Sequence, residues 1–268
     1  LHGVDWDQAH SRGGVRCRAD DRLQRLCPHG FAARLLELCR RNGALLVADE
    51  IWTGLGRAGH WLYGSVQEIE PDLICLGKGL GGGLPISACL GRRDLMAAWS
   101  RDAEVVHTST FAGAPLASVA ALATLDALEA EGLVERARRV GGEFARALDS
   151  MLAEVSRGAS RALVTGAGLM VGVELGARPG LSLEVQRRLL ARGYIVSLGG
   201  GKRESVVLTP PLDISERLLE GFVGVLRAVF GGGSLTGDLA ISDTADAAAI
   251  EAQLRASEIA FSLPPAVL

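Results

Sequence analysis

The hydrophobic pattern of the first half of the chain alternates between helix-like and strand-like stretches. Residues 28–41 carry apolar side chains near helical spacing and basic residues in their last turn, and Gly43 follows, which predicts a helix that stops there. Three short apolar runs of strand length follow, at residues 44–48, 73–77 and 85–91. Continuous apolar strands separated by loops and helices predict a mostly parallel sheet that is covered on both faces.

The second half of the chain is first helical and then mixed. Residues 114–131 and 133–155 have helical periodicity, so we expect two long helices there. A smaller α/β unit is predicted downstream, with strands at residues 169–175, 194–198 and 205–209 and helices at residues 183–192 and 215–230. The segment before residue 28 lacks apolar periodicity and is predicted to be loop. The tail from Gly231 opens as a linker, with one possible helix at residues 245–260.

The composition argues against a nucleic-acid-binding or membrane protein and against a disulfide-linked or metal-binding one. The 268 residues include 28 Lys and Arg against 31 Asp and Glu, so the net charge of −3 gives no basic surface for nucleic acid or anionic lipid. No window approaches the roughly 18 consecutive apolar residues of a spanning helix, and the first residues carry no export signal. The five cysteines contain no CxxC pair and predict reduced packing residues rather than a disulfide frame or a metal site. We expect a cytoplasmic protein without membrane or nucleic-acid partners.

Charged residues follow two of the predicted strands directly. Asp49 and Glu50 come after the run at residues 44–48, and Lys78, one of only two lysines, comes after the run at residues 73–77. Ligands bind at the carboxyl ends of strands in open α/β sheets. A lysine at such a strand end is partly desolvated, which favours a nucleophilic amine for Schiff-base chemistry. A solvated turn for the acidic pair and a surface position for Lys78 are the simpler alternatives.

A cluster of hydroxyl side chains precedes the first long helix. Thr108, Ser109 and Thr110 lie in the string HTSTFAG at residues 107–113. Hydroxyl and backbone N–H groups at a helix N-terminus suit a phosphate group, and helix capping is the alternative. A carboxylate, an imine-forming lysine and a phosphate anchor are together the three groups that pyridoxal 5'-phosphate requires.

Five ordered motifs resemble the class III pyridoxal-phosphate-dependent aminotransferases. They are ADEIWTGLGRAG (48–59), PDLICLGKGLGGGLPISACLG (71–91), HTSTFAGAPLASVAALATLDAL (107–128), VTGAGLMVGVEL (164–175) and LTPPLDIS (208–215). The resemblance covers about residues 28–230. It implies a fold type I transferase: α/β, with a partial large domain at 28–131, an interdomain helix and small C-terminal domain at 132–230, and unassigned ends at 1–27 and 231–268.

The resemblance also assigns roles to individual residues. Asp49 would pair with the protonated pyridine nitrogen of the cofactor, Ile51 would pack on one face of its ring, and Lys78 would form the Schiff base and move the substrate proton. Thr110, with Ser109 beside it, would bind the phosphate, in this family typically that of the partner subunit of a homodimer. The substrates would be an amino donor and a keto acid or aldehyde acceptor.

Several positions depart from the family pattern. Trp52 stands where many members have a glutamine that reaches the cofactor, Ala114 where asparagine is frequent, and Thr165 where arginine is common. Residues 1–27 resemble neither the family's phosphate loop nor its ring-stacking aromatic, and the chain begins with Leu1, so we expect the C-terminal part of such an enzyme. An aminomutase or epimerase on the same scaffold and a truncated, inactive homologue remain alternatives. The strand at 205–209 contains no arginine, which favours an amine or ω-amino donor.

Overall fold

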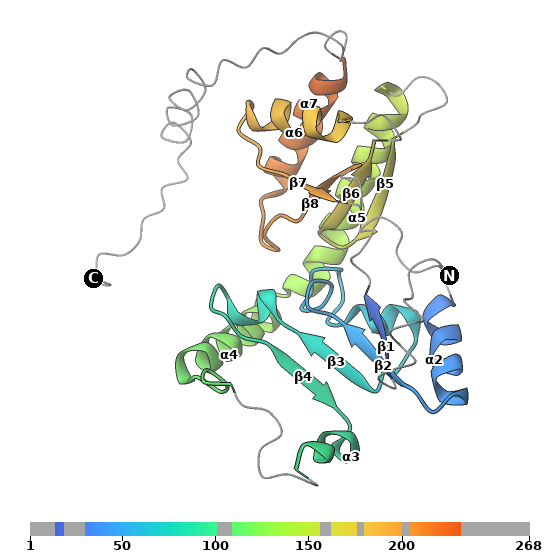
Figure 1. Cartoon of the computed structure of the whole chain (residues 1–268). Helices are drawn as coiled ribbons and strands as arrows, with labels where there is room; N and C mark the ends of the chain where they lie inside the picture. Colours follow the sequence, from blue (N-terminus) through green and yellow to red (C-terminus); the bar gives the residue numbers. More distant parts are fainter. Residues whose placement is uncertain are drawn as a thin grey trace.

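A computed structural model describes most of the middle of the chain and shows two sheets joined by a long helix (Figure 1). The described residues are 14–18, 30–100, 109–155, 162–175, 180–199 and 204–231. The possible helix at residues 245–260, and Thr108 of the hydroxyl cluster, lie outside these ranges.

The first sheet is mostly parallel, as the sequence predicts. Its strands are ordered β1 (Gly14–Arg18), β2 (Leu45–Asp49), β3 (Leu73–Leu76) and β4 (Ala88–Gly91). β1, β2 and β3 run parallel, and β4 pairs antiparallel with β3. The carboxyl ends of β2 and β3 therefore meet at one edge of the sheet, because Asp49 lies opposite Cys75 in the register.

One strand of this sheet corrects the sequence analysis. The segment before residue 28 was expected to be loop, yet residues 14–18 form β1, which pairs with β2 from Gly14 opposite Leu45 to Arg18 opposite Asp49. Such pairing uses backbone N–H and C=O groups, so a segment without apolar alternation can still join a sheet.

Helices pack on the first sheet from two directions. α2 (Phe31–Arg41) places buried Leu35, Leu36 and Cys39 against Leu46 of β2. α4 (Pro115–Ala130) places Ala121 and Leu128 against the β3 region. Short elements make the connections: η1 (Tyr63–Gln67), η2 (Lys78–Gly81), α3 (Arg93–Met96) and η3 (Ala97–Ser100).

α5 (Leu133–Val155) leads from the first sheet to the second, with the bounds that its periodicity predicts. The second sheet is antiparallel and ordered β5 (Leu163–Ala167), β6 (Met170–Glu174), β8 (Ser205–Leu208) and β7 (Ser197–Gly199). It has one strand more than the three expected, because residues 163–167, for which no strand was predicted, form β5 and pair antiparallel with β6 across the turn at Gly168.

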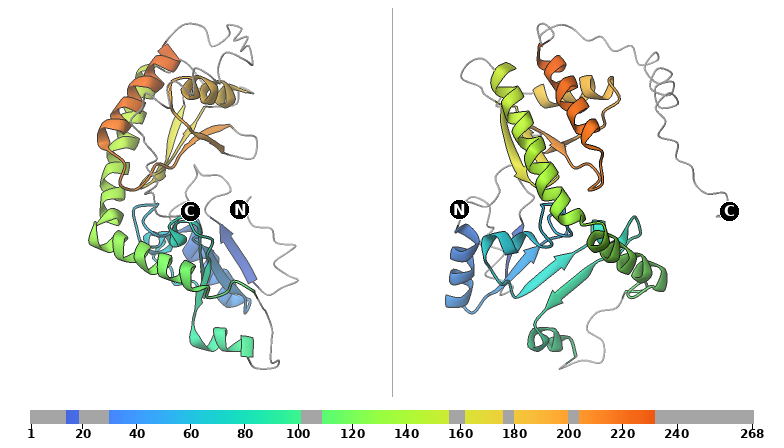
Figure 2. Two further views of the ribbon diagram at one scale, coloured as in Figure 1. Left: turned by 90° about the vertical axis from the view of Figure 1, so that its left-hand side faces the viewer. Right: turned by 180° about the vertical axis from the view of Figure 1, so that it is seen from behind.

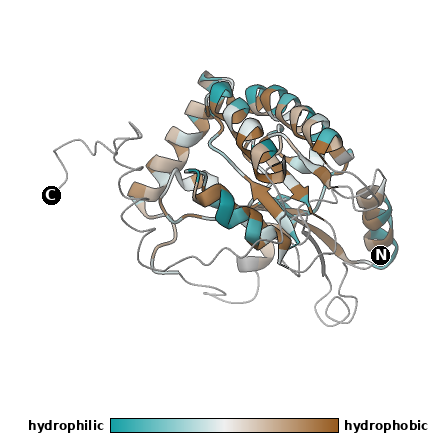
Figure 3. Cartoon of the chain, turned by 90° about the horizontal axis from the view of Figure 1, so that it is seen from above, coloured by the Kyte–Doolittle hydropathy of each residue, from teal (hydrophilic) through white to brown (hydrophobic). Residues whose placement is uncertain are grey.

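The second sheet forms one continuous core with its helices. α5 and α7 (Glu216–Gly231) lie side by side, and α6 (Leu181–Leu190) completes the unit (Figure 2). Phe222 of α7 makes edge-to-face contacts with Phe144 at 5.9 Å and with Tyr194 at 5.3 Å between ring centroids. Brown, hydrophobic residues run along the strands, while the helices alternate brown and teal, as expected for elements that bury one side (Figure 3).

Candidate active site

Two adjacent carboxylates are buried at the end of β2, and they accept hydrogen bonds from different groups. The Asp49 Oδ1 atom accepts a hydrogen bond from the backbone N–H of Ile51 at 3.2 Å. The Glu50 carboxylate accepts one from the Thr53 hydroxyl and another from the backbone N–H of Gly64 at 2.6 Å. Burial excludes the solvated-turn alternative for this pair. Glu50 therefore fixes the loop after β2, and Asp49 stays at the strand end.

Lys78 begins the turn that follows β3, in a left-handed conformation with φ of +44°. This conformation is uncommon for a residue with a side chain, and such residues cluster at functional sites. A Cβ atom on the preceding Gly77 would lie 3.3 Å from Cγ2 of Ile51, so the strand ends approach closely here. Lys78 is exposed in the described chain, so the burial that its strand-end position led us to expect is not observed.

A cavity of about 730 Å³ opens at this edge of the first sheet. Ile51, Trp52 and Lys78 line one wall, and residues 209 and 211–213, which follow β8, line another. The second wall is held in place by Arg136 of α5, which donates hydrogen bonds to the carbonyl oxygens of Leu212 and Ile214. The cavity thus lies where the two sheets approach each other.

Trp52 connects the two sides of this cavity. The Lys78 Nζ atom lies 4.3 Å from the centroid of the Trp52 ring, which is cation–π distance. Trp52 also packs against buried Met170 of β6 and Val207 of β8. The sequence pattern marked this position only as a departure, and the structure gives it contacts in both halves.

Arg57 is a functional position that sequence reasoning missed. Its Nη1 atom donates to the carbonyl oxygens of Leu169 at 3.0 Å and Pro210 at 2.5 Å, and its own carbonyl accepts from the N–H of Leu169 at 3.1 Å. Burial lowers the pKa of the Arg57 guanidinium. Through these hydrogen bonds Arg57 ties the loop after β2 to the second unit, and the residue also lines the cavity. No sequence pattern indicated this role, because the hydrogen-bond partners of Arg57 lie more than a hundred residues away in the chain.

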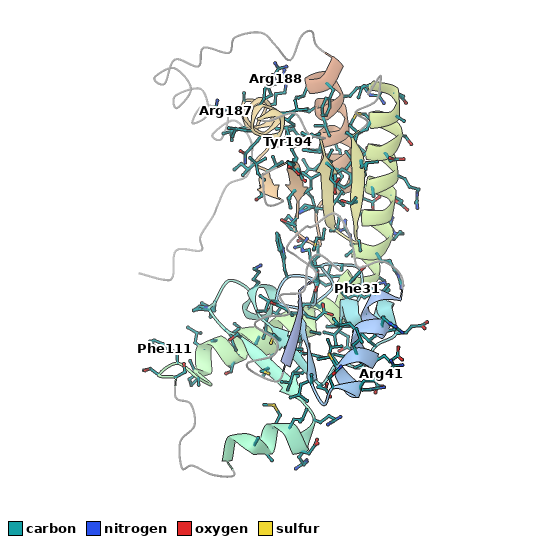
Figure 4. All side chains as sticks on the ribbon, turned by 45° about the vertical axis from the view of Figure 1, so that its right-hand side comes forward. Phe31, Arg41, Phe111, Arg187, Arg188 and Tyr194 are labelled. Carbon is teal, nitrogen blue, oxygen red and sulfur yellow. The ribbon has the colours of Figure 1, made fainter. Side chains whose placement is uncertain are left out.

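The hydroxyl cluster lies apart from this cavity in the described chain. Ser109 and Thr110 are exposed and precede α4, whose N-cap is Ala114 and receives no side-chain hydrogen bond. Neither hydroxyl caps the helix, so the capping alternative is excluded for these two. Phe111 is 82% exposed and projects outward beside them (Figure 4). The structure thus brings Ile51 and Lys78 together on one cavity with Asp49 at the adjacent strand end, and leaves Ser109 and Thr110 on an outer surface.

The described residues offer neither a metal site nor a membrane-spanning helix. They contain no group of three or more His, Cys, Asp or Glu side chains that could hold a metal ion. Within the same residues, every helix is too short or too polar to cross a membrane. Cys39 and Cys89 are free thiols, and burial, with a smaller effect of nearby Asp72, raises the pKa of the Cys39 thiol.

A partly parallel sheet with a lysine and a buried carboxylate at neighbouring strand ends, joined to an antiparallel C-terminal unit, defines the fold type I class of pyridoxal-phosphate-dependent enzymes. The sequence profile of the class-III aminotransferases matches residues 25–230. The chain belongs to the class-III aminotransferase family, whose members use pyridoxal phosphate.

Curated relatives and solved structures agree with this assignment. The chain is 37% identical over 206 residues to an acetylornithine aminotransferase of Mycobacterium tuberculosis, covering 75% of this chain and 48% of the relative. It is 36% identical to ornithine aminotransferase 1 of Staphylococcus aureus, covering 76% and 48%. The structure of an ornithine aminotransferase from Plasmodium yoelii matches with a TM-score of 0.66 and 32% identity, covering 75% of this chain and 51% of that one. The chain spans about half the length of the curated relatives that it matches.

Proposed function

We propose that the protein is a pyridoxal-phosphate-dependent aminotransferase that moves an amino group between an amine or amino acid and a keto acid or aldehyde. The observation that carries the proposal is the placement of Lys78 and Ile51 on one cavity, with the buried Asp49 carboxylate at the neighbouring strand end. Family membership and the names of the relatives support the same reaction.

The residues present fit the cofactor. An exposed amine is free to form a Schiff base with an aldehyde, a branched side chain beside it offers an apolar face for a ring, and a buried carboxylate can hold a proton on a ring nitrogen. We assign these roles to Lys78, Ile51 and Asp49. When bound, pyridoxal phosphate acts as an electron sink for the bond that breaks at the substrate's amine-bearing carbon.

The chain's own residues then perform the proton steps. With the cofactor bound, Lys78 Nζ would move the proton at the substrate's amine-bearing carbon, as general base and then acid. The Asp49 carboxylate would hold a proton on the ring nitrogen, and the N–H of Ile51 orients its Oδ1 atom. Trp52, Arg57 and the 211–213 segment shape the substrate side of the cavity.

We further propose that the active protein is a cytoplasmic homodimer. Ser109 and Thr110 are exposed and cap no helix, so they are available to the phosphate of a cofactor held by a second copy. Beside them α4 exposes apolar side chains that its own sheet does not cover, namely Leu116, Val119 and Leu122. The free thiols support a reducing compartment.

The direct test adds pyridoxal phosphate to the purified chain, reduces with borohydride and maps the pyridoxyl group by mass spectrometry. We expect the adduct on Lys78 and its loss in Lys78→Ala, with the circular dichroism spectrum unchanged because the lysine is exposed. An adduct on Lys202 alone, or on neither lysine, would refute the assignment. Product analysis with amine and keto acid pairs then separates transamination from mutase or epimerase chemistry.

Asp49→Asn separates cofactor binding from chemistry. The amide keeps the oxygen that accepts from Ile51 but cannot stabilise a protonated ring nitrogen. We expect the rate of proton abstraction in single turnovers to fall more than the affinity for the cofactor. An unchanged abstraction rate would remove Asp49 from the mechanism.

A further inference from the structure

The amine of Lys78 lies beside the aromatic ring of Trp52, which takes no part in the proton steps proposed above. Its Nζ atom lies 4.3 Å from the centroid of the Trp52 ring. A lysine ammonium over an aromatic face is attracted by the negative charge density of that face, and tryptophan gives the strongest such attraction. The exposed Lys78 side chain therefore has a preferred position, although it lies outside the core.

Trp52 itself packs on the second sheet. It packs against Met170 and Val207, which are 1% and 2% exposed and lie on paired strands of the second sheet. The loop that carries Trp52 is fixed by the Glu50 carboxylate at Thr53 and Gly64. The indole thus lies between buried side chains of the second sheet and the amine of Lys78.

We propose that Trp52 is a positioning residue for Lys78: its indole face holds the protonated amine at the end of β3 and ties that position to the second sheet. The proposal rests on the proposed function for its relevance to catalysis, while the contact itself does not require the cofactor. In a working enzyme, the indole face is the resting place of the Lys78 ammonium whenever the amine is free and charged. A glutamine at this position offers an amide instead of an aromatic face, so the chain holds its lysine differently from relatives with that residue.

The test measures the reactivity of the Lys78 amine in the chain without added cofactor. The chain contains only two lysines, so Lys202 is an internal reference. Limiting acetic anhydride at fixed pH acetylates free amines, and peptide mass spectrometry gives the ratio of acetylated Lys78 to acetylated Lys202. Loss of the aromatic face in Trp52→Leu should free the amine and raise this ratio about two- to fivefold, the factor that corresponds to an exposed cation–π contact.

Three further variants make the result specific. Trp52→Phe keeps an aromatic face and should raise the ratio less than Trp52→Leu does. Val207→Ala removes part of the surface against which the indole packs. It should raise the ratio of acetylated Lys78 to acetylated Lys202, although it leaves Lys78 itself unaltered. Trp61→Leu, on the same loop and partly exposed, is the matched control and should leave the ratio unchanged.

Several outcomes would overturn the proposal. An unchanged ratio in folded Trp52→Leu, an equal rise in Trp52→Phe, or an equal rise in Trp61→Leu would each exclude positioning by the indole face. If Trp52→Leu fails to fold by circular dichroism, Trp52→Phe and Val207→Ala decide, and an unchanged ratio in both excludes the role. Failure of the proposed function is a separate result, since it is the absence of a borohydride-fixed pyridoxyl group on Lys78 of the unaltered chain.

Discussion

The two halves of the molecule bury their hydrophobic residues in different ways. In the described chain, the unit built from α5, α6, α7 and the second sheet joins 19 buried residues in one core cluster. The region around the first sheet divides its buried residues between clusters of 4 and 5. The first region also exposes large apolar side chains along α4, whereas Ala117, Ala121 and Leu128 of the same helix are buried.

This difference shows that the second unit covers its hydrophobic core with its own helices, whereas the first region leaves part of its apolar surface uncovered. The second unit has helices on its sheet and an unbroken interior, so its stability comes from within the chain. The first region exposes several large apolar side chains on one helix, and contiguous apolar surface is typical of interaction sites, so we propose that the second copy binds here. The proposed catalytic groups Asp49 and Lys78 belong to this less enclosed region.

The largest effect is expected from a cavity in the second core. Leu148 and Leu46 are both fully buried, one in each region. Leu148→Ala should cost about 2–5 kcal/mol of unfolding free energy, because the surrounding core cannot collapse into the gap. Leu46→Ala is the matched control and should fall at or below the low end of this range, because its small cluster can relax. Urea denaturation measures both, and equal losses would contradict the comparison.

The packing of α5 on the β5–β6 turn, inside the second unit, should be the next most sensitive point. A Cβ atom on Gly141 of α5 would lie 1.9 Å from the carbonyl oxygen of Gly168, a distance that real contacts do not allow. Gly141→Ala should therefore separate α5 from the β5–β6 turn, at a cost of about 1–3 kcal/mol. A Cβ atom on the adjacent Gly142 would make only an ordinary contact, 3.8 Å from Nη1 of Arg146, so Gly142→Ala is the control and should be neutral or slightly stabilising. Thermal denaturation that treats the two variants alike would argue against close packing here.

These two sites also show what the sequence could and could not predict. The periodicity of α5 gave its bounds, because a long amphipathic helix repeats one local rule many times. The approach of Gly141 to Gly168, and the bonds of Arg57 to Leu169 and Pro210, depend on distant segments that meet only after folding. β1 was missed because its pairing depends on the backbone.

For the site, the residue types were predictable and their surroundings were not. Strand-end positions identified Asp49 and Lys78, the hydroxyl cluster before a long helix identified Ser109 and Thr110, and the family resemblance added Ile51. The division of labour between Asp49 and Glu50 required the structure, since adjacent carboxylates look equivalent in sequence. The exposure of Lys78 reversed the expectation of desolvation, because strand-end position does not decide what covers a side chain.

The exposed face of α4 should affect association much more than stability. Leu122→Glu places a charge on that face and should convert a dimer to a monomer in sedimentation velocity, while unfolding free energy changes by less than about 0.5 kcal/mol. Asp126→Asn, an exposed position one turn further along α4, is the control and should leave association intact. A monomeric unaltered chain, or a dimer that survives Leu122→Glu, would contradict an interface at this face.

The smallest effect is expected at the surface of the well-packed unit, where Arg139 of α5 and Glu216 of α7 form an exposed ion pair at 2.9 Å. The hydrogen bond and charge of Arg139 lower the pKa of the Glu216 carboxyl below its ordinary value of 4.5. The pair therefore stabilises the folded state above that ordinary value, and the contribution is lost as pH falls through the lowered pKa. Glu216→Gln should slightly lower the melting temperature at pH 7 and make no difference in acid below that pKa. Melting curves across the acid range test the sign, and a difference that grows on acidification would show that the carboxylate opposes folding. Added salt should shrink the neutral-pH difference, because exposed charges are screened.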